Sequence, residues 1–134
     1  MPAEGGPEVQ VTRNGGDLGI EAPDGTLYYT RQEGDDVGVW KLLPGGRSEQ
    51  VLPSCFLITN LDVTATGIYV TPRPKADGST TVQRVRFADG KVETVAELPS
   101  AIWFGLSVSP DERTILYSQV DRVESNLMLV DRLR

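Results

Sequence analysis

The sequence predicts an all-β fold, and two observations carry this prediction. Short apolar runs alternate with turn residues, since the 134 residues include 14 Gly and 9 Pro, and this distribution favours strands over helices. An apolar strand also recurs with starts at Leu27, Ile68 and Ile115, which are 41 and 47 residues apart. A period of this length, with four antiparallel strands in each unit, is typical of a β-propeller blade.

The first unit, residues 16–52, contains four expected strands. Its second strand (TLYYTR) follows Pro23-Asp24-Gly25, where Pro pre-sets φ, Asp bonds the backbone and Gly accepts a positive φ. This apolar strand suits the middle of a blade that is packed on both faces, whereas the fourth strand (SEQVL) suits a half-exposed edge. The four strands are expected at residues 17–22, 26–31, 37–43 and 48–52.

The same order of strands recurs in two further units. The second unit, residues 60–98, has expected strands at residues 60–64, 68–73, 81–87 and 91–98. The third unit, residues 103–134, has expected strands only at residues 105–109, 114–119 and 126–133. Its fourth strand is missing, but residues 7–12 (PEVQVT) alternate polar and apolar side chains as an outer strand does. Residues 1–134 are therefore expected to form one propeller unit of three blades.

A match between the two ends of the sequence suggests how the third blade is completed. Residues 128–134 followed by residues 3–11 parallel the expected hairpin of residues 39–51. Because three blades are too few to close a ring, we expect a two-fold homodimer with six blades, in which residues 7–12 of each copy complete the third blade of the other. A ring of another size, an open arc and a fragment of a longer propeller remain as alternatives. The residues expected in this strand exchange are Val9, Val11, Leu127 and Leu129.

Two turn segments resemble a known family. Residues 22–29 (APDGTLYY) and residues 109–117 (SPDERTILY) resemble the Pro-Asp repeats of TolB-like, WD40-like propellers, in which Ser-Pro-Asp-Gly precedes an apolar strand. The resemblance covers nearly the whole chain, implies six blades in the ring and would allow a location in the bacterial periplasm. It describes architecture better than function. The second unit departs from the motif with Thr64-Ala65-Thr66-Gly67, and the third carries Glu112 in place of Gly, which is expected to weaken both turns.

Charge and composition argue against several classes of function. The formal net charge is −6 and the sequence has no His, so we expect neither a nucleic-acid surface of clustered Lys and Arg nor a Ser-His-Asp triad. The sequence also lacks a Gly-x-Ser-x-Gly elbow and a Gly-rich phosphate-binding loop. We therefore predict no enzymatic activity, no cofactor and no metal. Cys55, the single cysteine, is expected to be a small buried hydrophobic residue.

Membrane association is not expected either. No apolar run approaches the roughly 20 residues that a membrane-spanning helix needs. Residues 1–10 have neither the basic nor the apolar region of a signal peptide. The compartment stays undetermined.

A ligand would bind best in the axial channel of a propeller, where the first strands of the blades face each other. Three arginines, Arg31, Arg73 and Arg122, are among the channel candidates, and their alternative role is surface solvation or ion pairing. The predicted function is a non-catalytic scaffold that binds a protein, peptide or small ligand, and the alternative is a purely structural or engineered half-propeller without a ligand. The channel candidates are Asp17, Asp62, Thr64, Ser107, Arg31, Arg73, Arg122 and Trp103.

Overall fold

The computed structural model describes residues 15–121 and 124–131 of the chain. Within these residues the regular secondary structure consists of β-strands alone, which confirms the predicted all-β class. The strand expected at residues 7–12, with Val9 and Val11, lies outside the described residues, and so does the channel candidate Arg122.

The strands form three antiparallel sheets, each a simple meander. The first sheet contains β1 (Leu18–Glu21), β2 (Leu27–Glu33), β3 (Asp36–Leu42) and β4 (Ser48–Cys55), in that order. The second contains β5 (Leu61–Val63), β6 (Gly67–Val70), β7 (Thr80–Arg86) and β8 (Val92–Leu98), also in order. The third has three described strands, β9 (Leu106–Val108), β10 (Thr114–Asp121) and β11 (Glu124–Asp131), with β10 in the middle.

Each described strand coincides with a strand expected from the sequence, and the larger shifts in bounds have local causes. β6 ends at Val70 rather than at residue 73, because Pro72 lacks the N–H group that would continue the ladder. β4 continues to Cys55 rather than ending at residue 52. Its pairing with β3 changes register between Val37 and Trp40, an irregularity typical of a β-bulge.

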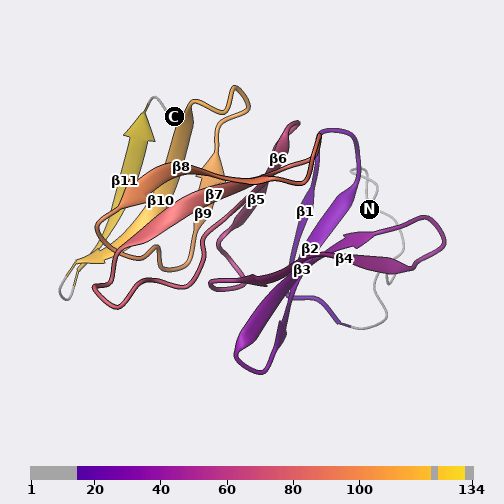
Figure 1. The fold of residues 1–134 in the computed structure, drawn as a ribbon, viewed down its shortest axis with the longest axis horizontal. Coiled ribbons are helices and arrows are strands. Elements are labelled where there is room, and N and C mark those ends of the chain that lie inside the picture. Colours follow the sequence, from indigo (N-terminus) through magenta and orange to yellow (C-terminus); the bar gives the residue numbers. More distant parts are fainter. Residues whose placement is uncertain (1–14, 122–123, 132–134) are drawn as a thin grey trace.

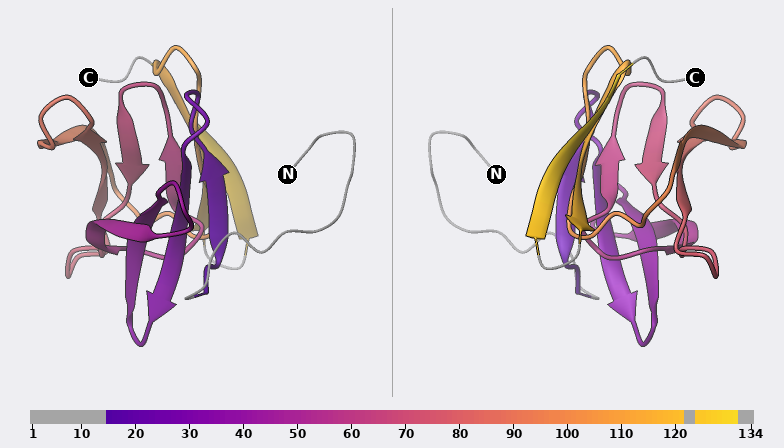
Figure 2. Two further views of the ribbon diagram at one scale, coloured as in Figure 1. Left: turned by 90° about the vertical axis from the view of Figure 1, so that its right-hand side faces the viewer. Right: turned by 90° about the vertical axis from the view of Figure 1, so that its left-hand side faces the viewer.

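The three sheets lie side by side along the long axis of the molecule (Figure 1), with the second sheet between the other two. Viewed along that axis in Figure 2, the sheets overlap, as stacked sheets do. The first strand of each sheet lies on the line of contact, since β5 is adjacent to both β1 and β9. The fourth strands, β4 and β8, lie at the opposite edges of their sheets.

Two apolar cores hold the sheets together, one on each side of the second sheet. Tyr28 and Ile68 belong to the core between the first and second sheets. Tyr69 and Ile115 belong to the core between the second and third sheets. Because all four residues of β6 are buried, this strand packs on both faces, as its apolar sequence predicts.

Two linkers connect the sheets and share two local features. The first linker comprises residues 56–60, and the second comprises residues 99–105. Leu57 in the first and Phe104 in the second have positive φ angles of 64° and 62°, in the left-handed region that side chains other than Gly rarely adopt. The residue before each donates its N–H to the second strand of the next sheet or to the residue that follows it: Phe56 to the carbonyl of Thr71, just after β6 (2.7 Å), and Trp103 to the carbonyl of Ser118 in β10 (3.3 Å).

Candidate functional site

Two predicted channel carboxylates hold the backbone in place. Asp62 lies in the middle of β5 and accepts hydrogen bonds from the N–H groups of Val63 (2.8 Å) and Val108 (2.7 Å). Since Val108 belongs to β9, Asp62 joins the second sheet to the third. Asp17, just before β1, accepts a hydrogen bond from the N–H of Gln32 (2.8 Å). Both carboxylates therefore have structural partners.

The predicted arginines that the structure describes form contacts with acidic residues. Arg31 pairs with Glu33 of the same strand. Arg73, which follows β6, donates a hydrogen bond to the backbone carbonyl of Asp35 and lies 3.8 Å from the carboxylate of Asp36. Asp35 and Asp36 lie where β2 turns into β3, so Arg73 joins the second sheet to the first and lies at the rim of a pocket between them.

This pocket, which we call the linker pocket, has a volume of about 240 Å³. Its wall is mostly apolar and comes mainly from both linkers and from the first sheet, and it includes a few polar groups. Such a combination of an apolar wall with a few polar groups is typical of small ligand sites. The lining residues are Gln32, Asp35, Val37, Cys55, Phe56, Leu57, Ile58, Arg73 and Phe104.

The two linker residues with positive φ, Leu57 and Phe104, both line this pocket. A left-handed conformation costs a residue with a side chain about 1–2 kcal/mol, and such strained residues concentrate at binding and active sites. Phe104 is 70% exposed and Trp103 is 40% exposed. The ring of Trp103 meets Phe56 edge-on at 5.3 Å between centroids, so the channel candidate Trp103 lies beside the pocket wall.

Cys55 lies in the wall of the linker pocket without the properties of a nucleophile. It is 3% exposed, and this burial raises the pKa of its thiol to about 11. The thiol therefore stays protonated at neutral pH, whereas thiol reactivity requires the thiolate. Cys55 packs in the core between the first and second sheets, as expected for a small buried hydrophobic residue.

A polar cluster, which we call the Glu112 junction, joins the second sheet to the third. Glu112 lies in the turn between β9 and β10, and its carboxylate accepts hydrogen bonds from the hydroxyls of Thr64 (2.7 Å), Thr66 and Tyr69 (2.9 Å). The guanidinium of Arg84 lies 3.6 Å from the same oxygen. The channel candidate Thr64 is thus a buried member of a contact between sheets.

The Glu112 junction shifts the ionisation of its members. Burial by itself raises the pKa of Glu112, but the hydrogen bonds from Thr66, Thr64 and Tyr69 and the charge of Arg84 outweigh burial, so the pKa lies below its usual value. Burial, together with its hydrogen bond to Glu112, raises the pKa of Tyr69 to about 12. At neutral pH Glu112 is therefore an anion that accepts bonds from neutral hydroxyls.

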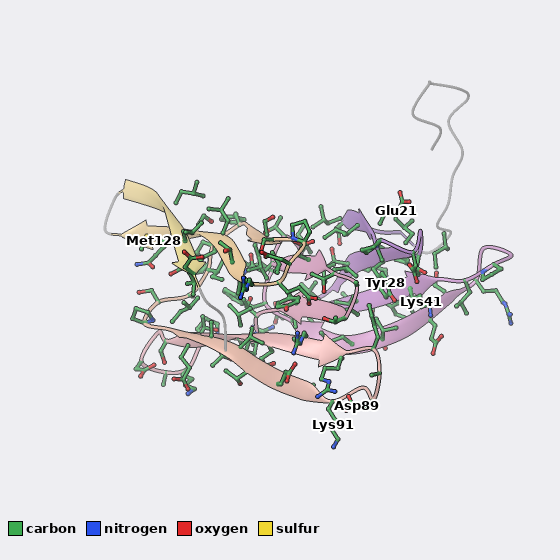
Figure 3. All side chains as sticks on the ribbon, turned by 90° about the horizontal axis from the view of Figure 1, so that it is seen from above. Glu21, Tyr28, Lys41, Asp89, Lys91 and Met128 are labelled. Atoms are coloured by element: carbon green, nitrogen blue, oxygen red, sulfur yellow. The ribbon has the colours of Figure 1, made fainter. Side chains whose placement is uncertain are left out.

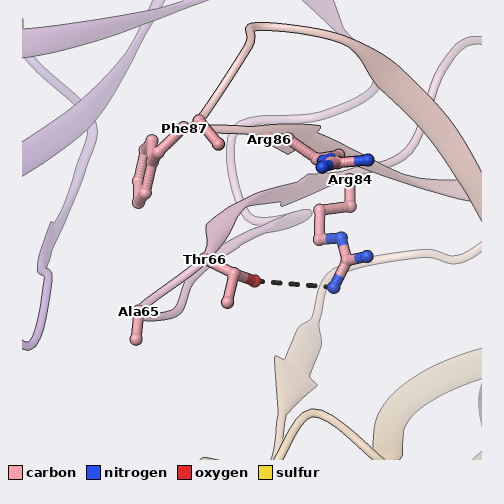
Figure 4. Close-up of a pocket in the computed structure, with 6 residues that line it drawn as sticks. Ala65, Thr66, Arg84, Arg86 and Phe87 are labelled. Atoms are coloured by element: carbon pink, nitrogen blue, oxygen red, sulfur yellow. Dashed lines mark hydrogen bonds between the residues drawn. The ribbon is translucent and has the colours of Figure 1, made fainter.

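An open depression of about 590 Å³ adjoins this junction (Figure 4), lined by Ala65, Thr66, Arg84, Arg86, Phe87 and Ala88. Arg84 points toward Thr66, with 3.5 Å between Nη1 and the hydroxyl oxygen, and it forms an ion pair with Glu93. Arg86 lies 3.6 Å from the carboxylate of Asp89. Because both guanidinium groups have acidic partners, the depression is a poor site for an anion.

Sequence reasoning missed Leu57, Phe104 and Glu112. A signal for the first two was present, since Phe56-Leu57 and Trp103-Phe104 both precede a first strand of a sheet. Glu112 was interpreted only as a lost glycine, because its three hydroxyl partners belong to another unit of the repeat. Ser107, by contrast, is exposed on β9.

Comparisons of the chain with protein-family models, with curated proteins and with solved structures find no match. Among the described residues, no group of three or more His, Cys, Asp or Glu side chains could hold a metal ion. The same part of the chain contains no helix long and apolar enough to cross a membrane.

Proposed function

We propose that the chain is a non-catalytic binding module of the β-propeller type, similar to the TolB-like, WD40-like repeats, and that two copies close a six-bladed ring. The observation that carries this proposal is the arrangement of the sheets: each is a meander, and β5 lies between β1 and β9. In a propeller the first strands of the blades line a common axis in the same way.

Strand exchange would complete the ring. β11 is the edge of the third sheet as far as the structure describes it, and edge strands present unpaired backbone groups to another strand. Residues 7–12 have the alternating pattern of an outer strand. In the proposed dimer this segment of one copy pairs with β11 of the other, where Leu127 and Leu129 lie at 71% and 60% exposure.

The linker pocket is the proposed ligand site. Its volume of about 240 Å³ suits one aromatic or branched apolar side chain, which would lie against Phe104 and Phe56. Gln32 and Arg73 supply donors, and Asp35 supplies an acceptor, for the polar groups beside that side chain. The proposed ligand is therefore a peptide, or a small molecule of similar polarity, with one bulky apolar group.

Light scattering and a truncation test the assembly. The wild-type chain should have about twice the 14.6 kDa mass of one copy. Deletion of residues 1–12 should abolish the dimer or cause aggregation, while deletion of residues 1–6 should leave it intact. A monomer at all concentrations, or a stable dimer without residues 1–12, would contradict the strand exchange.

A peptide screen by thermal shift tests the ligand site. A ligand that binds the native state raises its stability by RT ln(1 + [L]/Kd), so peptides with Phe, Leu or Trp should raise Tm and peptides of Ser and Gly should not. Phe104→Ala and Arg73→Gln should remove the shift, while the distant control Phe87→Ala should keep it.

A second candidate is a purely structural half-propeller. It is favoured by Asp62 and Thr64, two channel candidates whose polar groups already have partners. An absence of any shift across the screen, in a protein with the expected dimer mass, would support this candidate and exclude the linker pocket as a ligand site.

A further inference from the structure

The outward face of the third sheet is apolar and open. Register pairs Leu116 with Ser107 and Leu129, and pairs Ser118 with Leu127, so these five side chains share one face. We call this set the third-sheet face. Leu116, Leu127 and Leu129 are 38%, 71% and 60% exposed. A groove of about 250 Å³ follows the face and is bounded by Phe104.

The same positions in the other two sheets are covered by the sheet that follows. Tyr28 and Tyr69 pair with the first strand as Leu116 does, yet they are 5% and 1% exposed. Thr30 and Thr71 are the counterparts of Ser118, and both are fully buried. The third-sheet face is therefore the free end of a stacking pattern that the chain forms twice.

The linkers take part in each of these covered junctions. The hydroxyl of Thr30 donates to the carbonyl of Ile58 in the first linker (3.0 Å). The amide of Asn60 donates to the carbonyl of Ile102 in the second linker (2.9 Å). A covered face thus has both apolar contact and a hydrogen bond to the next linker. Ser118, at the place that corresponds to Thr30, donates its hydroxyl to the carbonyl of Trp103 in the linker that precedes its own sheet.

We propose that the third-sheet face docks against the outward face of the first sheet in a second copy of the chain. We call the face of a sheet that packs against the preceding sheet its receiving face. In the second and third sheets this face contains the pairs Leu61–Val70 and Leu106–Tyr117. The first sheet has Gly19 paired with Tyr29 at this place. This inference rests on the proposed propeller assembly, and it names the surfaces that meet in it.

The receiving face of the first sheet is aromatic in composition. Trp40 pairs with Tyr29 across β2 and β3. Within the sheet, the hydroxyl of Tyr29 donates to Ser48 of β4 (2.6 Å), and the guanidinium of Arg31 lies over the ring of Trp40. Gly19 leaves space, since an added Cβ would meet nothing closer than 3.7 Å. Figure 3 labels Met128 of the third sheet and Lys41 of the first sheet toward opposite ends of the molecule. Because the second sheet lies between the other two (Figure 1), the outward faces of the first and third sheets meet only between copies.

Single charged substitutions on each face test the docking. Leu129→Glu and Gly19→Lys change exposed positions, so the fold of each copy should be preserved and the circular dichroism spectrum should match that of wild type. Each alone should weaken the dimer at least about tenfold in Kd by sedimentation, because a charge would be buried without a partner. Val92→Glu, at an exposed position of β8, is the control and should leave Kd unchanged.

Mixing the two variants identifies the partner surface. A mixed dimer has one unmodified junction and one in which a carboxylate faces an ammonium group, so mixing should restore Kd to within about threefold of wild type. If Leu129→Glu weakens the dimer and the mixture does not recover, the face binds another surface and the inference is wrong. If neither variant matters but deletion of residues 1–12 abolishes the dimer, the strand exchange stands and the docking of these faces is wrong. A wild-type monomer contradicts both.

Discussion

Glu112 departs from the Ser-Pro-Asp-Gly motif and joins the second sheet to the third. Its φ is 58°, a conformation that Gly adopts at lower cost. In the first and third sheets the turn aspartates Asp24 and Asp111 accept backbone hydrogen bonds within their own turns. The second sheet has Thr64 and Thr66 instead, and both hydroxyls donate to Glu112. The two departures from the motif therefore contact each other, and their bonds cross between sheets.

Glu112→Gln should lower the free energy of unfolding by about 1–3 kcal/mol, because a neutral amide is a weaker acceptor for the three hydroxyls and leaves Arg84 without this charge. Denaturant unfolding at pH 7 measures the change. Glu49→Gln, an exposed position on β4, is the matched control and should change little. Equal stability of the two variants would mean that the Glu112 junction contributes nothing.

The lowered pKa of Glu112 predicts a specific loss of stability in acid. A carboxyl whose pKa is lower in the folded than in the unfolded state stabilises the fold above the unfolded value, here near 4.5, and this contribution disappears as pH falls through the folded pKa. The stability difference between wild type and Glu112→Gln should therefore shrink from pH 7 to pH 3. The exposed carboxyls of Asp24, Asp77 and Asp111 also have lowered pKa values, but they titrate in both proteins and cancel in this difference.

At the scale of elements, the close pairing of β6 with β7 depends on Gly67. This residue begins β6 and is buried. A Cβ at this position would lie 2.5 Å from the carbonyl oxygen of Val85 and 3.0 Å from Cγ of Arg84. Arg84 belongs to the Glu112 junction, so the same small residue allows both the strand pairing and the contact between the second and third sheets.

Gly67→Ala should lower the free energy of unfolding by about 1–3 kcal/mol, because the backbone of β7 has to move to accept the methyl group. Gly19→Ala is the matched control, since its Cβ would make only an ordinary contact at 3.7 Å with Leu27. Chemical denaturation of dilute protein compares the two variants. A Gly67→Ala protein no less stable than the control would show that β7 shifts without cost.

At the scale of the whole molecule, the stacking of sheets has two unlike ends. The second sheet is covered on both faces by the two cores. On the third sheet, by contrast, Leu127 is 71% exposed and Leu129 is 60% exposed, and the two lie next to each other on one face. Contiguous exposed apolar residues of this kind mark interaction surfaces.

The proposed dimer predicts that Tm rises with protein concentration, because association stabilises the folded state by mass action. Scanning calorimetry over a hundredfold range of concentration measures this. A midpoint that is independent of concentration would contradict the dimer.

The sequence by itself determined the strands and their order. Alternation of side chains and the turn at Pro23-Asp24-Gly25 act over a few residues, so their effects are readable locally. The same local reasoning placed Leu127 and Leu129 in the last strand. Period and strand order then predicted the three units within which the sheets formed.

Only the tertiary structure decided what the functional candidates contact. Glu112 bonds Thr64 across 48 residues of sequence, and Asp62 bonds the N–H of Val108 across 46. Phe104 joins Arg73 in the linker pocket although they belong to different parts of the repeat. Such contacts depend on how one sheet stacks on the next, which burial of apolar faces decides for the whole chain at once. The local sequence pattern does not indicate which residue of another sheet a side chain will contact. For this reason the sequence predicted which residues are candidates but not the hydrogen bonds that they form.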